Sequence, residues 1–154
     1  MPINPLITNN IIDSCAFDPK YEPEASASFE VFRLAKEEKF SLIIAHSTQK
    51  EINHPNTPAW VKAEACRICT LNVPLTANEF AVLTKIETIL AGNGKVKNVK
   101  QDSQHVFEAQ KYGSYFITTD KRILLRAEQL VRECIVSVLR PSDFLELVNH
   151  YLMQ

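Results

Sequence analysis

The sequence predicts an α/β fold in three layers, with helices on both faces of a mostly parallel central sheet of about four to five strands. Two observations predict this fold class. Short apolar runs of strand length alternate along the chain with longer segments that carry apolar residues at helical spacing. The strand-like runs are apolar almost throughout, which is typical of parallel strands buried on both faces. Right-handed crossovers would then place the connecting helices on both sides of the sheet.

The first strand and helix of the predicted order lie near the N-terminus. Residues 9–13, NNIID, have the pattern of a short strand that ends in a carboxylate. A loop with two prolines follows, and then a helix is predicted over about 26–39. We expect Phe29, Phe32 and Ala35 to share the apolar face of this helix, because their spacing matches the helical period.

The next predicted elements are a buried strand and two helices. The run FSLIIAH, 40–46, is continuously apolar over the length of a strand. Ser47 can then cap a short helix that carries Glu51. The prolines of NHPNTP end that helix, and a further helix is predicted over about 58–70.

A capping box marks the start of the following helix. Thr76 with Glu79 three residues later fits the pattern, and glycines stand where two helices should end, at Gly92 and Gly113. The apolar stripe of the helix after Thr76 consists of Phe80, Leu83, Ile86 and Leu90. Later elements are predicted as a helix over 102–112, a strand over 114–118, a helical stretch to about 132, a strand over 134–139 and a final helix opened by Pro141 and Ser142.

Length and composition indicate one ordinary globular domain over 1–154. The chain has 154 residues, of which 45% are hydrophobic, and its net charge is −1. This charge excludes a protein that coats nucleic acid through overall positive charge. No stretch approaches the roughly 20 apolar residues of a membrane span, and MPINPLITNN lacks the features of a signal peptide. We therefore expect a cytoplasmic protein without membrane contact, whose four cysteines are reduced thiols.

Four carboxylates are predicted to meet at the carboxyl edge of the sheet. Asp13 ends the first strand, and Asp120 lies two residues after the strand over 114–118. Asp102 begins the helix that leads into that strand, and Glu51 lies early in the helix after the second strand. In open parallel sheets, ligands bind beyond the carboxyl ends of the strands, so these residues form a candidate site.

Such a group of carboxylates repels itself unless a cation neutralises it. Ligation by oxygen atoms suits Mg²⁺ or Mn²⁺, and the chemistry that follows is metal-assisted hydrolysis of a phosphodiester. Taken singly, each acid also has a structural interpretation. These interpretations are a helix N-cap for Asp102, a turn for Asp120, a solvated helix position for Glu51 and a loop cap for Asp13.

The sequence resembles the PIN-domain family of ribonucleases, which includes the VapC-like toxins of toxin–antitoxin pairs. The resemblance spans about 9–148, and its most specific part is DSQHVFEAQKYGSYFITTDKRIL at 102–124. Three weaker parts are IIDSCAF at 11–17, HSTQKEI at 46–52 and LRPSDFLEL at 139–147. The resemblance implies an endoribonuclease that depends on Mg²⁺ or Mn²⁺ and acts on RNA.

Roles for individual residues follow from the same resemblance. Asp13, Glu51 and Asp102 match the core acids of the family, and Asp120 matches its fourth acid. Polar positions that contact a carboxylate or phosphate in the family are matched by Ser14 and by Thr118 or Thr119. A partner antitoxin and a homodimer are implied only through the resemblance. One departure is Cys15, where many toxins have Asn, so that the positioning of substrate there differs.

Several further residues have both a functional and a structural interpretation. His105 lies one helical turn after Asp102 and could contact substrate or orient an acid, or be a partly buried helix residue. A basic rim that steers RNA, or a solvated surface, is formed by Lys95, Lys97, Lys100, Lys121 and Arg122. The pair Cys66 and Cys69 lacks the second pair of ligands that a zinc site needs, so ordinary thiols are expected.

Two rival functions remain open from the sequence. The first is a PIN-like module that has lost its chemistry and binds RNA or protein. The second is a phosphohydrolase or phosphotransferase with Asp13 as its nucleophile, a reaction that in haloacid-dehalogenase-like enzymes needs a second Asp where this chain has Cys15.

Overall fold

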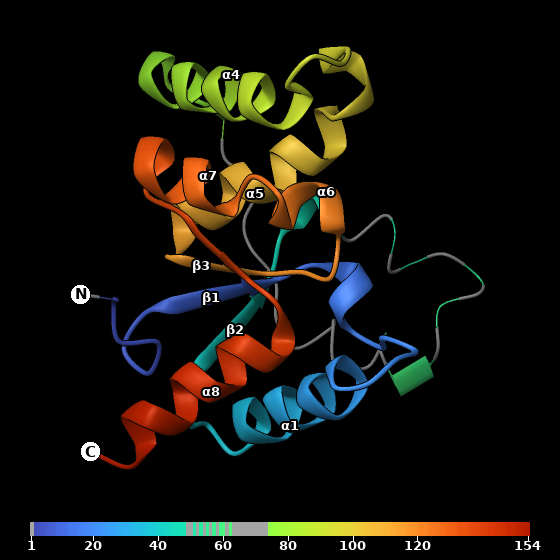
Figure 1. The fold of residues 1–154 in the computed structure, drawn as a ribbon, viewed down its shortest axis with the longest axis vertical. Coiled ribbons are helices and arrows are strands. Elements are labelled where there is room, and N and C mark those ends of the chain that lie inside the picture. Colours follow the sequence, from blue (N-terminus) through green and yellow to red (C-terminus); the bar gives the residue numbers. More distant parts are fainter. Residues whose placement is uncertain are drawn as a thin grey trace.

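The computed structural model describes residues 2–48 and 74–154, together with residues 51, 53, 55, 57, 59, 60 and 62. In these residues, four strands form one sheet in the order β2-β1-β3-β4, and every neighbouring pair is parallel. The strands are β1 (Asn9–Ile12), β2 (Ser41–Ile44), β3 (Tyr115–Ile117) and β4 (Ser137–Leu139). The predicted fold class is confirmed, with helices above and below a parallel sheet (Figure 1).

Each face of the sheet has its own hydrophobic core, because successive side chains of a strand point to opposite faces. Ile11 and Phe116, which pair in the register of β1 and β3, belong to one core cluster. Their neighbours Ile12 and Ile117 belong to the other. All four side chains are fully buried, which explains why the strand sequences are apolar without alternation.

Helices cover both faces of the sheet (Figure 1). On the first face, α1 (Glu24–Lys36) packs against α8 (Pro141–Leu152). On the second face lie α5 (Lys100–Tyr112) and α7 (Ala127–Cys134), and α4 (Ala77–Ala91) packs on both of them from outside. The short helix α6 (Lys121–Leu124) follows β3, and the 3₁₀ turns are η1 (Ser14–Ala16), η2 (His46–Thr48) and η3 (Val96–Asn98).

The predicted helix signals are present at their predicted places. The Thr76 hydroxyl accepts a hydrogen bond of 3.2 Å from the backbone N–H of Glu79, as an N-cap residue should. Gly92 ends α4 with a φ of +53°, a conformation that L residues other than Gly rarely adopt. Pro141 occupies the first turn of α8, where its missing N–H costs no hydrogen bond.

Three predicted boundaries were wrong, each for a local reason. The segment 134–139 is a strand only from Ser137, because Cys134 completes α7 and Ile135 has a left-handed backbone with φ of +59°. The helical stretch to 132 is two helices, α6 and α7. Asp102 is not an N-cap, because α5 already starts at Lys100.

The predicted apolar faces of α1 and α4 were also partly wrong. Phe32 is buried, but Phe29 is 73% exposed, and α1 instead buries Val31 and Leu34. In α4, Ile86 is buried whereas Phe80 is 62% exposed. Helical periodicity alone does not determine which residues of the apolar stripe are covered by the rest of the protein. The predicted helix over 58–70, with Cys66 and Cys69, lies outside the described residues apart from single positions.

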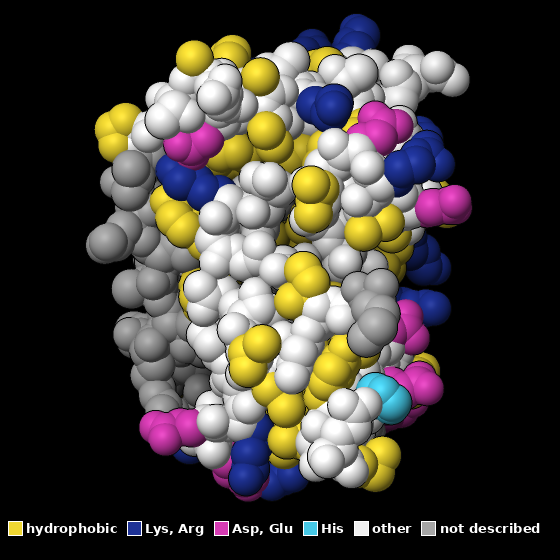
Figure 2. All heavy atoms as spheres, turned by 90° about the vertical axis from the view of Figure 1, so that its left-hand side faces the viewer, with side chains coloured by type: hydrophobic (Ala, Val, Ile, Leu, Met, Phe, Trp, Pro, Cys, Tyr) yellow, Lys and Arg dark blue, Asp and Glu magenta, His cyan; other side chains and the backbone are white. Residues whose placement is uncertain are grey.

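Within the described part of the chain, no helix is both long and apolar enough to cross a bilayer. Figure 2 shows acidic and basic side chains interspersed on one face of the molecule, with hydrophobic side chains in separate patches. Among the described residues seen there, the basic side chains form no continuous surface, in keeping with the net charge of −1.

Candidate metal centre at the carboxyl edge of the sheet

Asp13 lies at the end of strand β1, where the connections to the neighbouring strands lead to opposite sides. The chain runs from β1 through α1 to β2 on one side, and β3 returns on the other side of β1. At such a switch point the connections leave in opposite directions, so a crevice opens beyond the strand ends. Asp13 directly follows β1, and its backbone N–H donates to the carbonyl of Ile117 at 2.8 Å.

The Asp13 carboxylate is only 6% exposed and is held by three donors. Oδ1 accepts from the backbone N–H of Ser14 at 2.9 Å. Oδ2 accepts from the Thr118 hydroxyl at 2.8 Å and from the Cys15 thiol at 3.2 Å. The carboxylate is therefore fixed by its own turn and by the end of β3, with a defined orientation.

Burial raises the pKa of Asp13 above its ordinary value, and the nearby Glu51 carboxylate acts in the same direction. The charge of His105 and the hydrogen bonds from Thr118 and Cys15 oppose this shift in pKa. Among the described residues, no lysine or arginine forms an ion pair with Asp13. A buried carboxylate in this situation is stabilised by any cation that reaches it.

Glu51 and His105 complete a cluster around Asp13. Nδ1 of His105 lies 3.7 Å from Oδ1 of Asp13, and Nε2 of His105 lies 3.9 Å from Oε1 of Glu51. One donor atom from each of the three residues lies within 4.8 Å of the other two. Glu51 is oriented by hydrogen bonds from the Ser14 hydroxyl and from the Gln101 amide.

A second carboxylate pair lies beside this cluster and is bridged by an arginine. Nη2 of Arg122 lies 3.2 Å from Oδ2 of Asp102 and 2.8 Å from Oδ2 of Asp120. Hydrogen bonding to Arg122 lowers the pKa of Asp120. The pKa of Asp102 is raised by its burial, although Arg122 opposes the shift; the charges of Asp120 and Asp13 add to it. The four predicted acids thus form two adjacent subsites.

The predicted polar residues around the acids have defined partners. Thr118 binds Asp13 and Ser14 binds Glu51, as expected for residues that orient carboxylates. Thr119 does not contact a carboxylate in the described residues; its hydroxyl donates to the carbonyl of Cys15 at 3.0 Å. Cys15 itself contacts Asp13 and Thr118, and its burial raises the pKa of its thiol to about 11.

Ser47 does not act as the predicted helix cap. It lies within η2, and its hydroxyl donates to the carboxylate of Glu108, a buried residue of α5. The contact fixes the end of β2 to α5, since η2 directly follows the strand. It thereby supports the helix that carries His105.

The predicted basic rim is partly engaged in ion pairs. Lys100 lies 3.1 Å from Glu87, and Arg122 is bound to the two aspartates of its bridge. Lys95 and Lys97 flank the turn η3 before α5 and are exposed, as is Lys121 at the start of α6. Among the described residues, these three lysines form no salt bridge.

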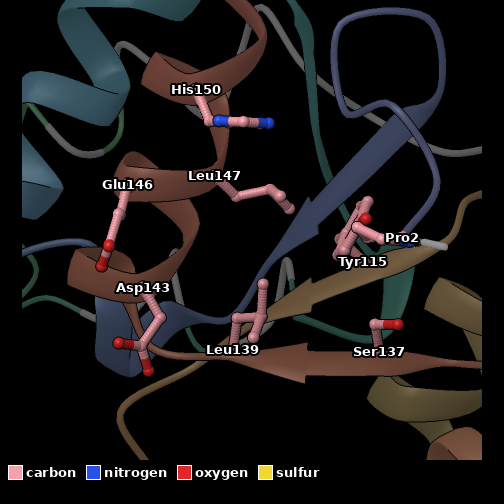
Figure 3. A pocket seen from close by; sticks show the side chains of 8 residues that line it. All are labelled: Pro2, Tyr115, Ser137, Leu139, Asp143, Glu146, Leu147 and His150. Carbon is pink, nitrogen blue, oxygen red and sulfur yellow. The ribbon is translucent and has the colours of Figure 1, made fainter.

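A separate pocket of about 490 Å³ lies between the sheet and α8 (Figure 3). Leu147 points from α8 toward the strands, and Tyr115 and Leu139 form the apolar wall. Its two carboxylates belong to Asp143 and Glu146, which lie on the side away from Tyr115. Asp143 pairs with Arg140 at 3.4 Å. This pocket is lined by none of the predicted site residues.

The structure brings the four predicted acids close together, and it places His105 and Arg122, which the sequence also suggested as site residues, among them. His105 was expected to contact substrate or orient an acid, and Arg122 to bind RNA; the spacing of His105 from Asp102 was the only signal for its position. Together, carboxylates and an imidazole at a buried strand end offer ligands for a divalent cation. No family model matches the chain, and no curated protein matches it either.

Proposed function

We propose that this protein is a metal-dependent endoribonuclease that hydrolyses phosphodiester bonds of RNA. One observation carries the proposal: the buried Asp13 carboxylate lies within 4.8 Å of donor atoms of Glu51 and His105, at the switch point of a parallel sheet. The sequence motifs that resemble those of PIN-domain ribonucleases support the same function.

The residues present fit a divalent cation. Asp13 and Glu51 would bring two negative charges together without an arginine or lysine between them in the described residues. The Nε2 atom of His105 is buried and has no hydrogen-bond partner in the described part of the chain, so this nitrogen is open to a cation. Asp13 and Glu51 would hold Mg²⁺ or Mn²⁺. When bound, such a cation lowers the pKa of a water ligand and stabilises negative charge on the phosphate.

The chain's own residues would hold the reacting groups in place. Thr118 and Ser14 orient the two carboxylates that would bind the cation. Asp102 and Asp120 would accept a proton from the attacking water or hold it through hydrogen bonds. Arg122, whose side chain is 71% exposed, would turn from these aspartates to a phosphate of the RNA, because guanidinium binds phosphate with two hydrogen bonds.

RNA would approach along the surface that carries the exposed lysines. Lys95, Lys97 and Lys121 lie near α5 and α6, next to Asp102 and Asp120 in the chain. Local positive charge steers a polyanion even when the net charge of the protein is near zero. Through the family resemblance we further propose that the chain forms a homodimer and is the toxin partner of an antitoxin protein.

The proposal is tested by incubating the protein with a panel of structured and single-stranded RNAs in Mn²⁺ or Mg²⁺. We expect internal cuts that are abolished by EDTA and by Asp13→Asn, and reduced by roughly two to three orders of magnitude in Asp102→Asn. His150→Gln, an exposed position on α8, serves as a control of unchanged activity.

Two results would favour the rival functions. If the protein binds RNA but cuts none under any metal condition, a binding module without chemistry is the better description. If beryllofluoride, an analogue of a phosphoaspartate, binds at Asp13, the phosphotransferase is favoured. The geometry disfavours this second rival, because Oδ2 of Asp13 already accepts two hydrogen bonds and the side chain is buried.

A further inference from the structure

His105 is a buried imidazole with an unused polar atom. Its side chain is 2% exposed, and its Nε2 atom has no hydrogen-bond partner among the residues that the structure describes. Leaving a buried donor or acceptor unsatisfied costs stability, because the group loses its hydration and gains no partner, so native structures rarely retain one without a reason. Oε1 of Glu51 lies 3.9 Å from this Nε2 atom.

The distance between these two atoms is too long for a hydrogen bond and suits two ligands of one cation. Donors about 2.1 Å from a cation lie about 3.0 Å apart at a right angle and about 4.2 Å apart when opposite. The 3.9 Å between Nε2 of His105 and Oε1 of Glu51 falls in this range, and one donor atom each of His105, Glu51 and Asp13 lie within 4.8 Å of one another. A cation among the three residues would satisfy the unpartnered nitrogen and both carboxylates.

An imidazole ligand changes which cation the site prefers. Mg²⁺ is bound through oxygen ligands and water, whereas imidazole suits first-row transition metals. We propose that His105 is a direct nitrogen ligand, with Asp13 and Glu51, and that the site therefore takes Mn²⁺ or Co²⁺ in preference to Mg²⁺. The assignment rests on the metal site of the proposed function and specifies its third ligand and its metal.

The first test measures affinity by isothermal titration calorimetry of the full chain with Mn²⁺ and with Mg²⁺. We expect wild type to bind Mn²⁺ at least about tenfold more tightly than Mg²⁺. In His105→Gln the Mn²⁺ affinity should fall by about 10–100-fold or more, since the loss of a residue that merely supports a ligand already costs that much. The Mg²⁺ affinity should change little, and His150→Gln should behave as wild type.

The second test detects the nitrogen itself by electron spin echo envelope modulation of bound Mn²⁺. Wild type should show modulation from an imidazole nitrogen, which changes when the protein is labelled with ¹⁵N-histidine. The signal should be absent from His105→Gln. If that variant does not fold, the triple variant His46→Gln, His54→Gln, His150→Gln retains His105 as the sole histidine and should keep the signal.

The possible outcomes separate this inference from the proposed function. Equal affinity for Mn²⁺ and Mg²⁺ without nitrogen modulation overturns the role of His105 and leaves a site of oxygen ligands that can still cut RNA. Nitrogen modulation that persists in folded His105→Gln also overturns it. If neither cation binds to wild type, the metal site fails, and the proposed nuclease fails with it.

Discussion

At the scale of single residues, the central feature of the site is the buried and hydrogen-bonded carboxylate of Asp13. Three donors hold its carboxylate, yet burial raises its pKa, because the carboxylate has lost most of its hydration. Because the pKa of Asp13 is higher in the folded chain than in the unfolded one, the folded chain holds its proton to a higher pH. At neutral pH, where the group is charged, Asp13 therefore lowers the free energy of unfolding. A bound cation would offset the destabilisation caused by this buried charge, so a carboxylate that destabilises the metal-free protein can serve as a metal ligand.

The reactivity of the Cys15 thiol should depend strongly on pH. Its thiol has a pKa raised from 9.0 to about 11, by burial and by the charge of Asp13. Because the thiolate is the reactive form, roughly a hundredfold less of it is present at pH 8 than in an ordinary thiol. In EDTA, we expect alkylation of Cys15 by iodoacetamide to rise about tenfold per pH unit between pH 8 and pH 10.

Peptide mapping by mass spectrometry measures the rate at Cys15 separately from the other cysteines. The same protein unfolded in urea is the control, and its rate should reach half of its maximum near pH 9 and level off above that pH. A folded protein whose Cys15 reacts as fast as the unfolded chain at pH 8 would contradict the raised pKa.

The sequence allows prediction of some residues of the site and not of others. Asp13 and Thr118 follow buried strands directly, so the parallel sheet brings both to one edge. His105 and Arg122 lie on helices, and their direction depends on how α5 and α6 rotate against the sheet. No local pattern specifies that rotation, so the imidazole among the acids and the arginine bridge emerge only in three dimensions.

At the scale of elements, α1 and α8 are joined by a buried carboxylate. Glu24 in α1 is 2% exposed, and it accepts hydrogen bonds from the backbone N–H and the hydroxyl of Ser142 at 3.0 and 2.9 Å. It thus caps the first turn of α8 from another helix, where negative charge is favourable. This contact ties the N-terminus of α8 to the first residue of α1.

Removal of this cap should destabilise the whole chain. Because Glu24→Ala leaves the Ser142 donors without their partner, we expect the free energy of unfolding to fall by about 1–3 kcal/mol. Urea denaturation followed by circular dichroism measures the change. Glu30→Ala, on the same helix but at the surface, should leave the midpoint almost unchanged. Equal effects of the two substitutions would refute the capping role.

Gly113 joins α5 to β3 where the chain passes close to β1. A Cβ atom at this position would lie 2.4 Å from the backbone oxygen of Asn9. We expect Gly113→Ala to cost about 1–3 kcal/mol of stability, because the two backbones must separate. Gly94→Ala, whose Cβ would lie 3.1 Å from a backbone oxygen, should cost less in the same urea titration. A smaller loss for Gly113→Ala than for Gly94→Ala would contradict the close approach.

Helices and strands were predictable to the extent that their signals are local. Thr76, Gly92 and Pro141 mark helix ends by their own chemistry, and these ends are confirmed. The apolar residues of CIVSVL give no such mark. Cys134, at the end of α7, and Val136, just before β4, are both buried, so their apolar character does not mark the boundary between the two elements.

At the scale of the whole molecule, the strand order brings together residues that are far apart in the chain. Asp13 follows β1, and Thr118 to Asp120 follow the adjacent β3, more than 100 positions later. His105 is contributed by α5, which covers the upper face of the sheet (Figure 1). The alternation of helices and strands in the sequence predicts a parallel sheet. In a parallel sheet the carboxyl ends of the strands lie at one edge, which is why the four acids are expected there.

The central claim is that this edge binds a divalent cation through Asp13. Thermal unfolding in increasing Mn²⁺ tests it most directly. At a hundredfold excess over Kd, binding adds about 2.7 kcal/mol of stability, which raises the Tm of a chain of this length by about 5–10 °C. Asp13→Asn should fold with a Tm equal to or above that of wild type without metal, and Mn²⁺ should not raise it. A wild type that Mn²⁺ does not stabilise, or an equal rise in Asp13→Asn, would contradict the account.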